Sequence, residues 1–481
     1  MIKAGDSKSW FHCRRRAWYD HNPPAGLDER VDAFDRLIME AGQAHERRVL
    51  AQLENQFGPA QEARSAVHTR ELIDSGTALI FQPRFTAPDI GLEGWPDFLI
   101  RQHGGRYQVA DAKFAFSLAG HLEIRTQLAL YARLAGSDLP VLAYLGNGQV
   151  ESVDSATDFT RAERFLSEFS AELDSPRPPY AAFSESKCAA CPYDPVCRPA
   201  FEQAGELTLV YGVNERAAEA LRAIGIGDIA SLADAEAADL PDLPYLKGAK
   251  KYRAIAQARA QLHGEVIPLE RPDLPDGTWI HFDLESNPLS EIEGGEVYLW
   301  GLLSPPYRGD DYWRAWSDGG QAADEEAWRA FVKKLGQMRA AAPDLKLIHY
   351  SPFELTQIKL YAQRYRMETH PVVVWLLGPD SPLHDLAPDV RQGFALPLPG
   401  YGLKPVCKHP GLVNFHWELE ESGSQWSVVR YAEFRNTEDP RQRAEIRAEI
   451  ESYNRDDVRA TRALECWLRR LIAESWPERN A

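Results

Sequence analysis

Two aspartates and a lysine lie in segments that the sequence predicts to be the strands of one hairpin. Asp97 occurs in GWPDFLI, Asp111 and Lys113 occur in VADAKFA, and His-Gly-Gly at 103–105 marks the turn. Side chains two positions apart on a strand share a face, so pairing can bring all three together. Two carboxylates can hold Mg²⁺ or Mn²⁺ against a phosphate, and a lysine can stabilise developing charge. Exposed hairpin carboxylates are the simpler interpretation of this pattern taken alone.

A second set of acids is split between two distant segments. Asp283 and Glu285 alternate in WIHFDLES, which places both on one face of a predicted strand. Tyr453 and Asp457 in SYNRDDVRATRAL are spaced to share one face of a predicted helix. Either fragment alone is common. If the strand and the helix meet, their carboxylates form a second site for divalent cations.

Four cysteines connect the start of the chain to a point far along it. Cys13 follows GDSKSWFH, and Cys188, Cys191 and Cys197 form a C-x2-C-x5-C run. Such a tight loop is typical of metal centres, and six cysteines in 481 residues are too few for a disulfide scaffold. Four thiolates suit either an iron-sulfur cluster or tetrahedral Zn²⁺, and the spacing does not choose between them.

The elements that must position these residues predict a mixed α/β (α+β) protein of three domains. Residues 1–205 begin with a helix near 30–56 and continue in the order α-β-β-β-α-β, which restriction-endonuclease-like cores use. Residues 206–270 are Ala-rich and helical. The Pro-rich joint LERPDLPDG then opens a strand-rich third domain over 271–481.

Glycine turns at 224–227 and 246–249 divide the helical segment into paired helices. This arrangement resembles a helix-hairpin-helix connector, in which backbone N–H groups at a helix start bind phosphate, although a plain helical linker is the alternative. The net charge of -17 means that local basic patches must make any contact with nucleic acid. The candidate nucleic-acid-binding residues are Arg14, Arg15, Arg16, Gly225, Gly227, Lys247 and Lys250.

Composition places few other constraints on the chain. An apolar content of 44% and a charged content of 26% are ordinary for a globular protein. No strongly apolar run is long enough to span a bilayer, and the segment MIKAGDSKSW lacks the apolar region of a secretion signal. We therefore expect a cytoplasmic protein with no membrane partner.

The first set of motifs resembles the RecB-like nucleases of the PD-(D/E)XK superfamily that carry an iron-sulfur clasp. Relatives include the AddB nuclease domain and the CRISPR adaptation exonucleases. The resemblance implies that His45, Asp97 and Asp111 ligate Mg²⁺ or Mn²⁺ and that Lys113 is catalytic. It further implies a supporting role for a helical Gln/Tyr pair and a structural [4Fe-4S] cluster. The residues of these last two groups are Gln127 and Tyr131, and Cys13, Cys188, Cys191 and Cys197.

The second set resembles the tyrosine-bearing branch of the DEDD exonucleases, which have an RNase H-like fold, and in particular the YprB-like domains. The resemblance implies a two-metal site held by Asp283, Glu285, Glu354 and Asp457, with Tyr453 orienting the attacking water. Glu354, in HYSPFE, stands where the family normally has an aspartate. Asp385, in HDLAPDV, is either a supporting metal ligand or a helix N-cap. The alternative is an inactive fold that only binds nucleic acid.

Together these resemblances imply a metal-dependent DNA nuclease acting on single-stranded DNA or duplex ends. No G-x4-G-K-[ST] motif occurs, so unwinding would need a separate helicase. Two other functions stay open: a nucleic-acid-binding adaptor with one or both sites inactive, and a nuclease directed at RNA, because nothing in these motifs reads a 2′-hydroxyl.

Overall fold

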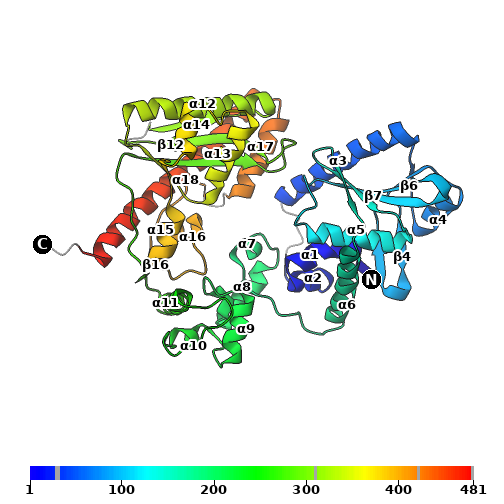
Figure 1. The fold of residues 1–481 in the computed structure, drawn as a ribbon, viewed down its shortest axis with the longest axis horizontal. Helices are drawn as coiled ribbons and strands as arrows, with labels where there is room; N and C mark the ends of the chain where they lie inside the picture. Colours follow the sequence, from blue (N-terminus) through cyan, green and yellow to red (C-terminus); the bar gives the residue numbers. More distant parts are fainter. Residues whose placement is uncertain (28–32, 308–310, 420–422, 478–481) are drawn as a thin grey trace. The chain divides into compact units, whose positions relative to one another are not determined.

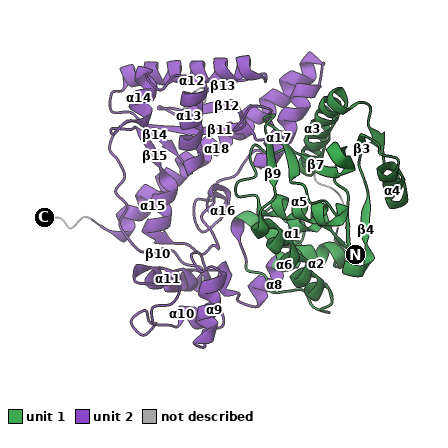
Figure 2. Cartoon of the chain, turned by 45° about the vertical axis from the view of Figure 1, so that its right-hand side comes forward, with its two compact units in different colours: residues 1–182, 186–197 green, residues 183–185, 198–481 purple. Residues whose placement is uncertain are grey.

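The computed structural model describes residues 1–27, 33–307, 311–419 and 423–477. The chain divides into two compact units (Figure 2): unit 1 contains 1–182 and 186–197, and unit 2 contains 183–185 and 198–481. The first three residues of the helix expected over 30–56 lie outside the described residues; the helix observed there is α3 (Ala33–Phe57). Both units combine sheets with many helices, which confirms the predicted mixed α/β class.

Unit 1 is built on a six-stranded sheet in the order β2-β3-β6-β7-β8-β9. The hairpin β6–β7 is antiparallel and pairs Phe98 with Ala110, whereas β7 and β8 run parallel and pair Ala112 with Tyr144. The strands of this sheet are β2 (Gln61–Glu62), β3 (Leu79–Phe81), β6 (Phe98–Arg101), β7 (Tyr107–Lys113), β8 (Val141–Leu145) and β9 (Val150–Val153).

Successive side chains along these strands point to opposite faces of the sheet, and each face packs against different helices. Phe98 and Ile100 pack with Val49 and Leu53 of α3. The alternate residues of the same strands, such as Leu99, pack with the helices on the other face. Figure 1 shows the sheet between α3 and α5. The other helices and strands of unit 1 are α1 (Ser7–His12), α2 (Arg14–His21), α4 (Ala66–Asp74), α5 (Leu122–Ala135), α6 (Ala156–Leu173), β1 (Ile2–Lys3), β4 (Phe85–Ala87) and β5 (Leu92–Gly94). Unit 1 also contains α7 (Glu185–Cys188) from residue 186 onward and residues 194–197 of α8 (Asp194–Gln203).

Unit 2 contains a five-stranded sheet in the order β13-β12-β11-β14-β15. β11 pairs antiparallel with β12 and parallel with β14. The strands are β11 (Trp279–Asn287), β12 (Glu296–Leu303), β13 (Tyr312–Trp316), β14 (Lys346–His349) and β15 (Leu383–Asp385). On one face Phe282 and Trp300 pack on Phe331 of α12 (Gln321–Ala341). The opposite face, which carries Asp283, is covered by α18 (Pro440–Ser475) (Figure 1).

Shorter helices complete unit 2. They are α13 (Pro352–Arg364), α14 (Pro371–Leu377), α15 (Leu386–Gly393), α16 (Leu403–Lys408) and α17 (Ser424–Asn436). The segment expected as a connector forms α9 (Glu215–Ala223), α10 (Ile229–Ala233) and α11 (Ala249–His263), which share their own apolar core. α11 is also tied to the strand pair β10 (Ile267–Pro268) and β16 (Phe394–Ala395), and Gln257 Nε2 donates to the Leu398 carbonyl at 2.9 Å.

No helix within the described ranges has the combination of length and apolar character that crossing a membrane requires.

Candidate active sites

The first acid set converges at the C-terminal end of β7. Asp97, just before β6, accepts a hydrogen bond from the Ala112 N–H at 2.7 Å through Oδ2. The Lys113 ammonium lies 2.8 Å from Asp111 Oδ1. The hairpin therefore holds both carboxylates and the lysine at one place, because Asp97 directly precedes Phe98, whose partner in the antiparallel register is Ala110, the residue before Asp111.

Burial and mutual repulsion shape the electrostatics of this cluster. Removal from water raises the pKa of Asp97 well above its usual range, and the neighbouring Asp111 raises it further. Burial opposes the charge of Lys113, but Asp111 and Asp97 outweigh that effect and raise the pKa of the ammonium. When both buried carboxylates are ionised, the single lysine leaves a net negative charge, which a proton or a divalent cation would neutralise.

Helix α5, which covers the face of the sheet opposite α3, supplies side chains next to Lys113. Gln127 of α5 accepts from the Lys113 ammonium at 2.9 Å, and its Nε2 donates to the Tyr131 hydroxyl at 2.8 Å. Burial, followed by Asp111 and Asp97, raises the pKa of Tyr131 well above its normal value. Gly94 allows this packing, since a Cβ there would lie 2.9 Å from Tyr131 Cε1.

His45 takes a different position. It is buried on α3, and its Nε2 lies 2.8 Å from the backbone oxygen of Tyr144, the register partner of Ala112. The hydrogen bonds described for the two aspartates do not include His45. Glu46, which the motif analysis missed, interacts electrostatically with Asp97 and Lys113, and its carboxylate accepts from Gln82 at 3.0 Å. Because Glu46 directly follows His45 in the sequence, its position could have indicated a role at this site.

The cysteine loop folds onto the N-terminal helices. The His12 ring lies 3.2 Å from the Lys187 carbonyl, and Lys187 donates back to the His12 carbonyl at 3.0 Å, so the residues preceding Cys13 and Cys188 are bonded to each other. The Tyr193 hydroxyl further donates to Asp20 at 2.8 Å.

The four cysteines are not joined in disulfides, and all four are partly buried. Burial raises the pKa of the Cys191 and Cys197 thiols, and both also interact with Cys13 and Cys188. Among the described residues, no three cysteine sulfurs lie within 4.8 Å of one another. The group of possible metal ligands that meets this distance there is a set of three acids in unit 2.

That set consists of Asp283 and Glu285 of β11 and Asp457 of α18, which each bring a carboxylate oxygen within 4.8 Å of the other two. Burial and the neighbouring acids raise the pKa of Asp283 well above its normal range. Burial and Asp457 raise the pKa of Glu285 to about 8. A strand face and a helix face thus meet in a buried pocket of carboxylates that favours either protonation or bound cations.

Residues that spacing did not single out hold these acids in place. Asn454 Nδ2 donates to Asp283 at 2.8 Å and to Glu285 at 3.3 Å, and its amide oxygen accepts from the Tyr312 hydroxyl at 2.7 Å. The Trp417 indole donates to Asp457 Oδ1 at 2.6 Å. For Asn454, the sequence did contain an indication of its role, because it directly follows Tyr453 in the helical motif.

Tyr453 lies within the cluster and hydrogen-bonds Asp457, and burial together with Glu285 raises the pKa of its hydroxyl well above normal. Lys404 of α16, also not anticipated, donates to the Tyr453 hydroxyl at 3.0 Å. Asp456 points elsewhere, accepting from the Glu418 N–H at 2.8 Å.

Glu354 approaches Asp283 without joining the compact group of three. It is buried in the first turn of α13, accepts from the Ser351 hydroxyl at 2.7 Å, and adds to the repulsion that raises the pKa of Asp283. Asp385 is the N-cap of α15 and accepts from the Ala387 N–H at 2.9 Å. Burial raises its pKa, and Glu354 contributes to the shift, so Asp385 lies near Glu354 while serving as a cap.

The basic candidates of unit 1 have internal partners. Arg14 forms ion pairs with Glu172 at 2.9 Å and with Glu168. Arg15 donates to the Pro179 carbonyl at 3.0 Å and hydrogen-bonds Cys197, and Arg16 acts electrostatically on Cys191. Arg15 and Arg16 therefore lie beside the cysteine loop, whereas Arg14 is paired with α6.

In unit 2, Gly225 has a φ of +89° at the turn between α9 and α10, and the Gly227 N–H donates to Ser231 Oγ at 3.1 Å. Lys247 and Lys250 are exposed on either side of Gly248, where α11 begins.

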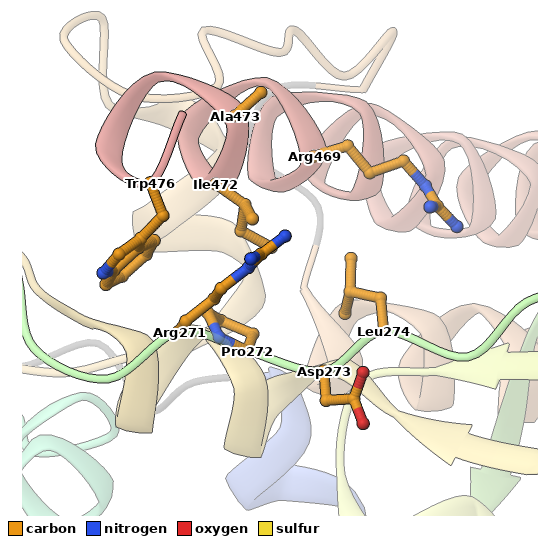
Figure 3. A pocket seen from close by; sticks show the side chains of 8 residues that line it. All are labelled: Arg271, Pro272, Asp273, Leu274, Arg469, Ile472, Ala473 and Trp476. Carbon is orange, nitrogen blue, oxygen red and sulfur yellow. The ribbon is translucent and has the colours of Figure 1, made fainter. Parts of the chain in front are cut away.

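A separate cavity of about 680 Å³ lies beside the C-terminal part of α18. Figure 3 shows Trp476, Ile472 and Arg271 together, with Arg469 directed away from Trp476. Arg469 is paired with Glu465 at 2.6 Å. Residues of the two acid clusters do not line this cavity, so it is not a candidate for the hydrolytic chemistry.

Comparison with known proteins gives a consistent picture. A family model described as the PD-(D/E)XK nuclease superfamily matches residues 9–198, and one described as the RNase H superfamily matches residues 280–469. No curated protein matches the chain. A solved structure titled "Crystal structure of SSO0001" is 15% identical with a TM-score of 0.23, over 41% of this chain and 85% of that one. The chain therefore contains a PD-(D/E)XK nuclease superfamily domain followed by an RNase H superfamily domain.

Proposed function

We propose that this protein is a Mg²⁺- or Mn²⁺-dependent nuclease with two hydrolytic sites, one in each unit, acting on single-stranded DNA or frayed duplex ends. The observation that carries the proposal is the convergence of Asp283, Glu285 and Asp457 within 4.8 Å, where burial and mutual repulsion raise the carboxyl pKa values. Oxygen ligands of this kind suit hard divalent cations. The bound cations would polarise the phosphodiester and stabilise the attacking and leaving oxygens.

In the first site, Asp97 and Asp111 would hold the cation, with His45 as the further ligand that the family resemblance suggests. Lys113 is aligned by Asp111 and Gln127, so its ammonium can lie against the phosphate and stabilise charge that develops there. Tyr131 and Gln127 restrict the lysine to that direction. His45 would have to use a ring nitrogen other than the one that faces the Tyr144 carbonyl.

In the second site, Asp283 interacts both with the pair Glu285 and Asp457 and with Glu354. Glu285 and Asp457 approach it on one side, and Glu354 acts on it from α13. This arrangement supports a site for two cations that has Asp283 in common. Tyr453 would orient the attacking water, while Asp385 would support Glu354 in addition to capping α15. A 3′-5′ exonuclease of the YprB-like kind is the mode that the resemblance favours.

We further propose that the four cysteines hold a [4Fe-4S] cluster that closes unit 1. The reciprocal hydrogen bonds between His12 and Lys187 support this, because they hold Cys13 beside the late cysteines. Thiol ligands of this kind require a reducing compartment such as the cytoplasm. Anaerobically purified protein should be brown and contain acid-labile sulfide, and Cys188→Ser should lose the colour. Colourless protein with one equivalent of zinc would contradict the assignment.

The domain boundaries at 205 and 270 are retained in the proposal, with residues 206–270 as a helix-hairpin-helix-like connector. The separate apolar core of α9, α10 and α11 supports that division. Gly225, Gly227, Lys247 and Lys250 would contact the DNA backbone, and a separate helicase would supply single strands. In unit 1, the RecB-like and AddB-like affiliation rests on the resemblance of the motifs.

The decisive experiment separates the two sites. Cleavage of end-labelled single strands, duplexes and RNA is measured with Mg²⁺ and with Mn²⁺ for wild type, Lys113→Ala, Asp283→Ala and the double variant. Each single variant should lose one activity while still unfolding in a cooperative thermal transition, which shows that it is folded. Metal-dependent cleavage that persists in the double variant would refute the proposal, and the RNA arm decides the substrate.

The second candidate function is a nucleic-acid-binding adaptor with inactive sites, and the observation that favours it is Glu354 in place of an aspartate. Glu354→Asp distinguishes the two functions. Restored cleavage in an otherwise inactive protein would show a site that has lost activity, whereas a wild-type protein that cleaves DNA excludes the adaptor.

A further inference from the structure

Lys404 is a lysine among the acids of the second site, and neither the motif analysis nor the family models assign it a role. It lies on α16, whose Val406 and Cys407 are fully buried and pack with Ala460 and Leu464 of α18. The Cys407 thiol also lies 3.6 Å from the Ala460 carbonyl. This packing fixes α16 against the helix that carries Tyr453 and Asp457.

The ammonium of Lys404 is enclosed by two aromatic rings. It lies 4.4 Å from the centroid of Tyr453 and 5.7 Å from that of Trp417, whose indole donates to Asp457. Cation–π contacts of this length are favourable and direct the ammonium toward the ring faces. Burial lowers the pKa of Lys404, and the attraction of Asp457 and Glu285 for its ammonium opposes that effect, so its charge interacts directly with the acid cluster.

The hydrogen bond between Lys404 and Tyr453 can run in one direction only. An ammonium has donors and no acceptor, so the Tyr453 oxygen must accept the bond at 3.0 Å. The hydroxyl hydrogen of Tyr453 is then left to be donated elsewhere, and Tyr453 does hydrogen-bond the Asp457 carboxylate. The chain of donors runs from Lys404 through Tyr453 to Asp457.

We propose that Lys404 is a positioning residue of the RNase H-like site, which fixes the hydroxyl direction of Tyr453 and places a positive charge beside Asp457 and Glu285. The inference rests on the proposed nuclease function of that site. It predicts two opposite effects of removing the charge. Turnover should fall because Tyr453 loses its fixed orientation, and Mn²⁺ should bind more tightly because a competing cation has gone.

The test uses the full chain carrying Lys113→Ala, so that only the second site cleaves. Lys404→Met, Lys404→Arg and Tyr453→Phe are compared in this background for kcat, KM and the Mn²⁺ dissociation constant from calorimetric titration. Lys408→Met is the matched control, since Lys408 lies on the same helix with its ammonium 5.6 Å from the Trp417 ring.

For Lys404→Met we expect kcat to fall about tenfold or more with KM nearly unchanged, and Mn²⁺ to bind about threefold or more tightly. Lys404→Arg should recover most of the turnover, because a guanidinium also donates. Adding Lys404→Met to Tyr453→Phe should lower kcat little further, since the two residues act through one bond.

Three results would overturn the inference. A Lys404→Met variant with unchanged kcat excludes the positioning role. Weaker Mn²⁺ binding together with lower kcat and a lower unfolding midpoint indicates that the lysine only supports the packing of α16. Absence of Asp283-dependent cleavage in the Lys113→Ala background removes both the nuclease assignment of this site and the inference, whereas the first two results leave that assignment intact.

Discussion

Gly301 is the position where the smallest change should disturb the second site most. It lies on β12 directly opposite Asp283 and beneath Asn454 of α18. A Cβ added there would lie 3.0 Å from Asn454 Cγ and 3.1 Å from Tyr312 Cε2, and closer still to the Asn454 amide oxygen. Asn454 is fully buried, so its amide cannot turn toward solvent. Gly301→Ala must therefore push this amide out of its place.

The expected loss of stability follows from the bonds that the amide makes. Overpacking a core position by one carbon costs about 1–3 kcal/mol. Loss of the bond from Tyr312 adds about 1 kcal/mol, and loss of the bond to the Asp283 carboxylate adds about 1.5–3 kcal/mol. Since relaxation recovers part of the sum, we expect about 3–5 kcal/mol, which lowers the unfolding midpoint by roughly 6–20 °C.

The assay pairs thermal unfolding with cleavage by the second site in the Lys113→Ala background. Asp283-dependent cleavage should fall about tenfold or more, because the amide no longer spaces Asp283 and Glu285. Adding Asn454→Ala should recover stability, since the new methyl group then occupies emptied space, without recovering cleavage. Gly336→Ala on α12 is the control, where the added Cβ would lie 3.1 Å from a single methyl group, that of Val372, and would disturb no polar group. A Gly301→Ala protein with wild-type midpoint and activity would refute the reasoning.

Three further predictions concern other parts of the chain. Burial opposes the charge of Asp158, but hydrogen bonds led by that from Arg125 outweigh it and hold its pKa below normal, so its stabilisation is present above about pH 4 and is lost at lower pH. Unfolding midpoints of wild type and Asp158→Asn should differ at pH 7, and the difference should shrink progressively as the pH falls below about 4. The pKa of Glu285 is raised to about 8 from 4.5, so the folded state binds the proton more tightly and the stability of metal-free protein should fall as pH rises through that interval. Unfolding in EDTA from pH 5 to 9 should show this decline, and Glu285→Gln should reduce it. Gly94→Ala should displace Tyr131 and lower first-site cleavage about tenfold, whereas unaltered cleavage would show that Tyr131 does not restrict Lys113.

Local periodicity was sufficient for the pairs of residues that lie close in sequence. Because a strand alternates its faces, the sequence alone predicted that Asp283 and Glu285 share a side. Helical periodicity likewise predicted that Tyr453 and Asp457 share one face of a helix. The same rules predicted the mixed α/β class, which the sheets and helices of both units confirm.

Strand and helix periodicity cannot predict hydrogen-bond partners that are distant in sequence and meet only through tertiary packing. Asn454 bonds Asp283 across 171 positions, and Lys404 reaches Tyr453 from a separate short helix. For His45 the resemblance implies a metal ligand, and the tertiary structure adds that its Nε2 lies 2.8 Å from the Tyr144 carbonyl, a partner 99 positions away that no local rule finds.

The sequence by itself determined which chemical groups are available and which face of its own strand or helix each one occupies, because those properties depend on residue type and backbone period. Only the tertiary structure decided which faces meet. That choice depends on the burial of apolar surface over whole elements, such as α18 on the sheet of unit 2, and this burial brings Asp457, Asn454 and Tyr453 to the acids of β11.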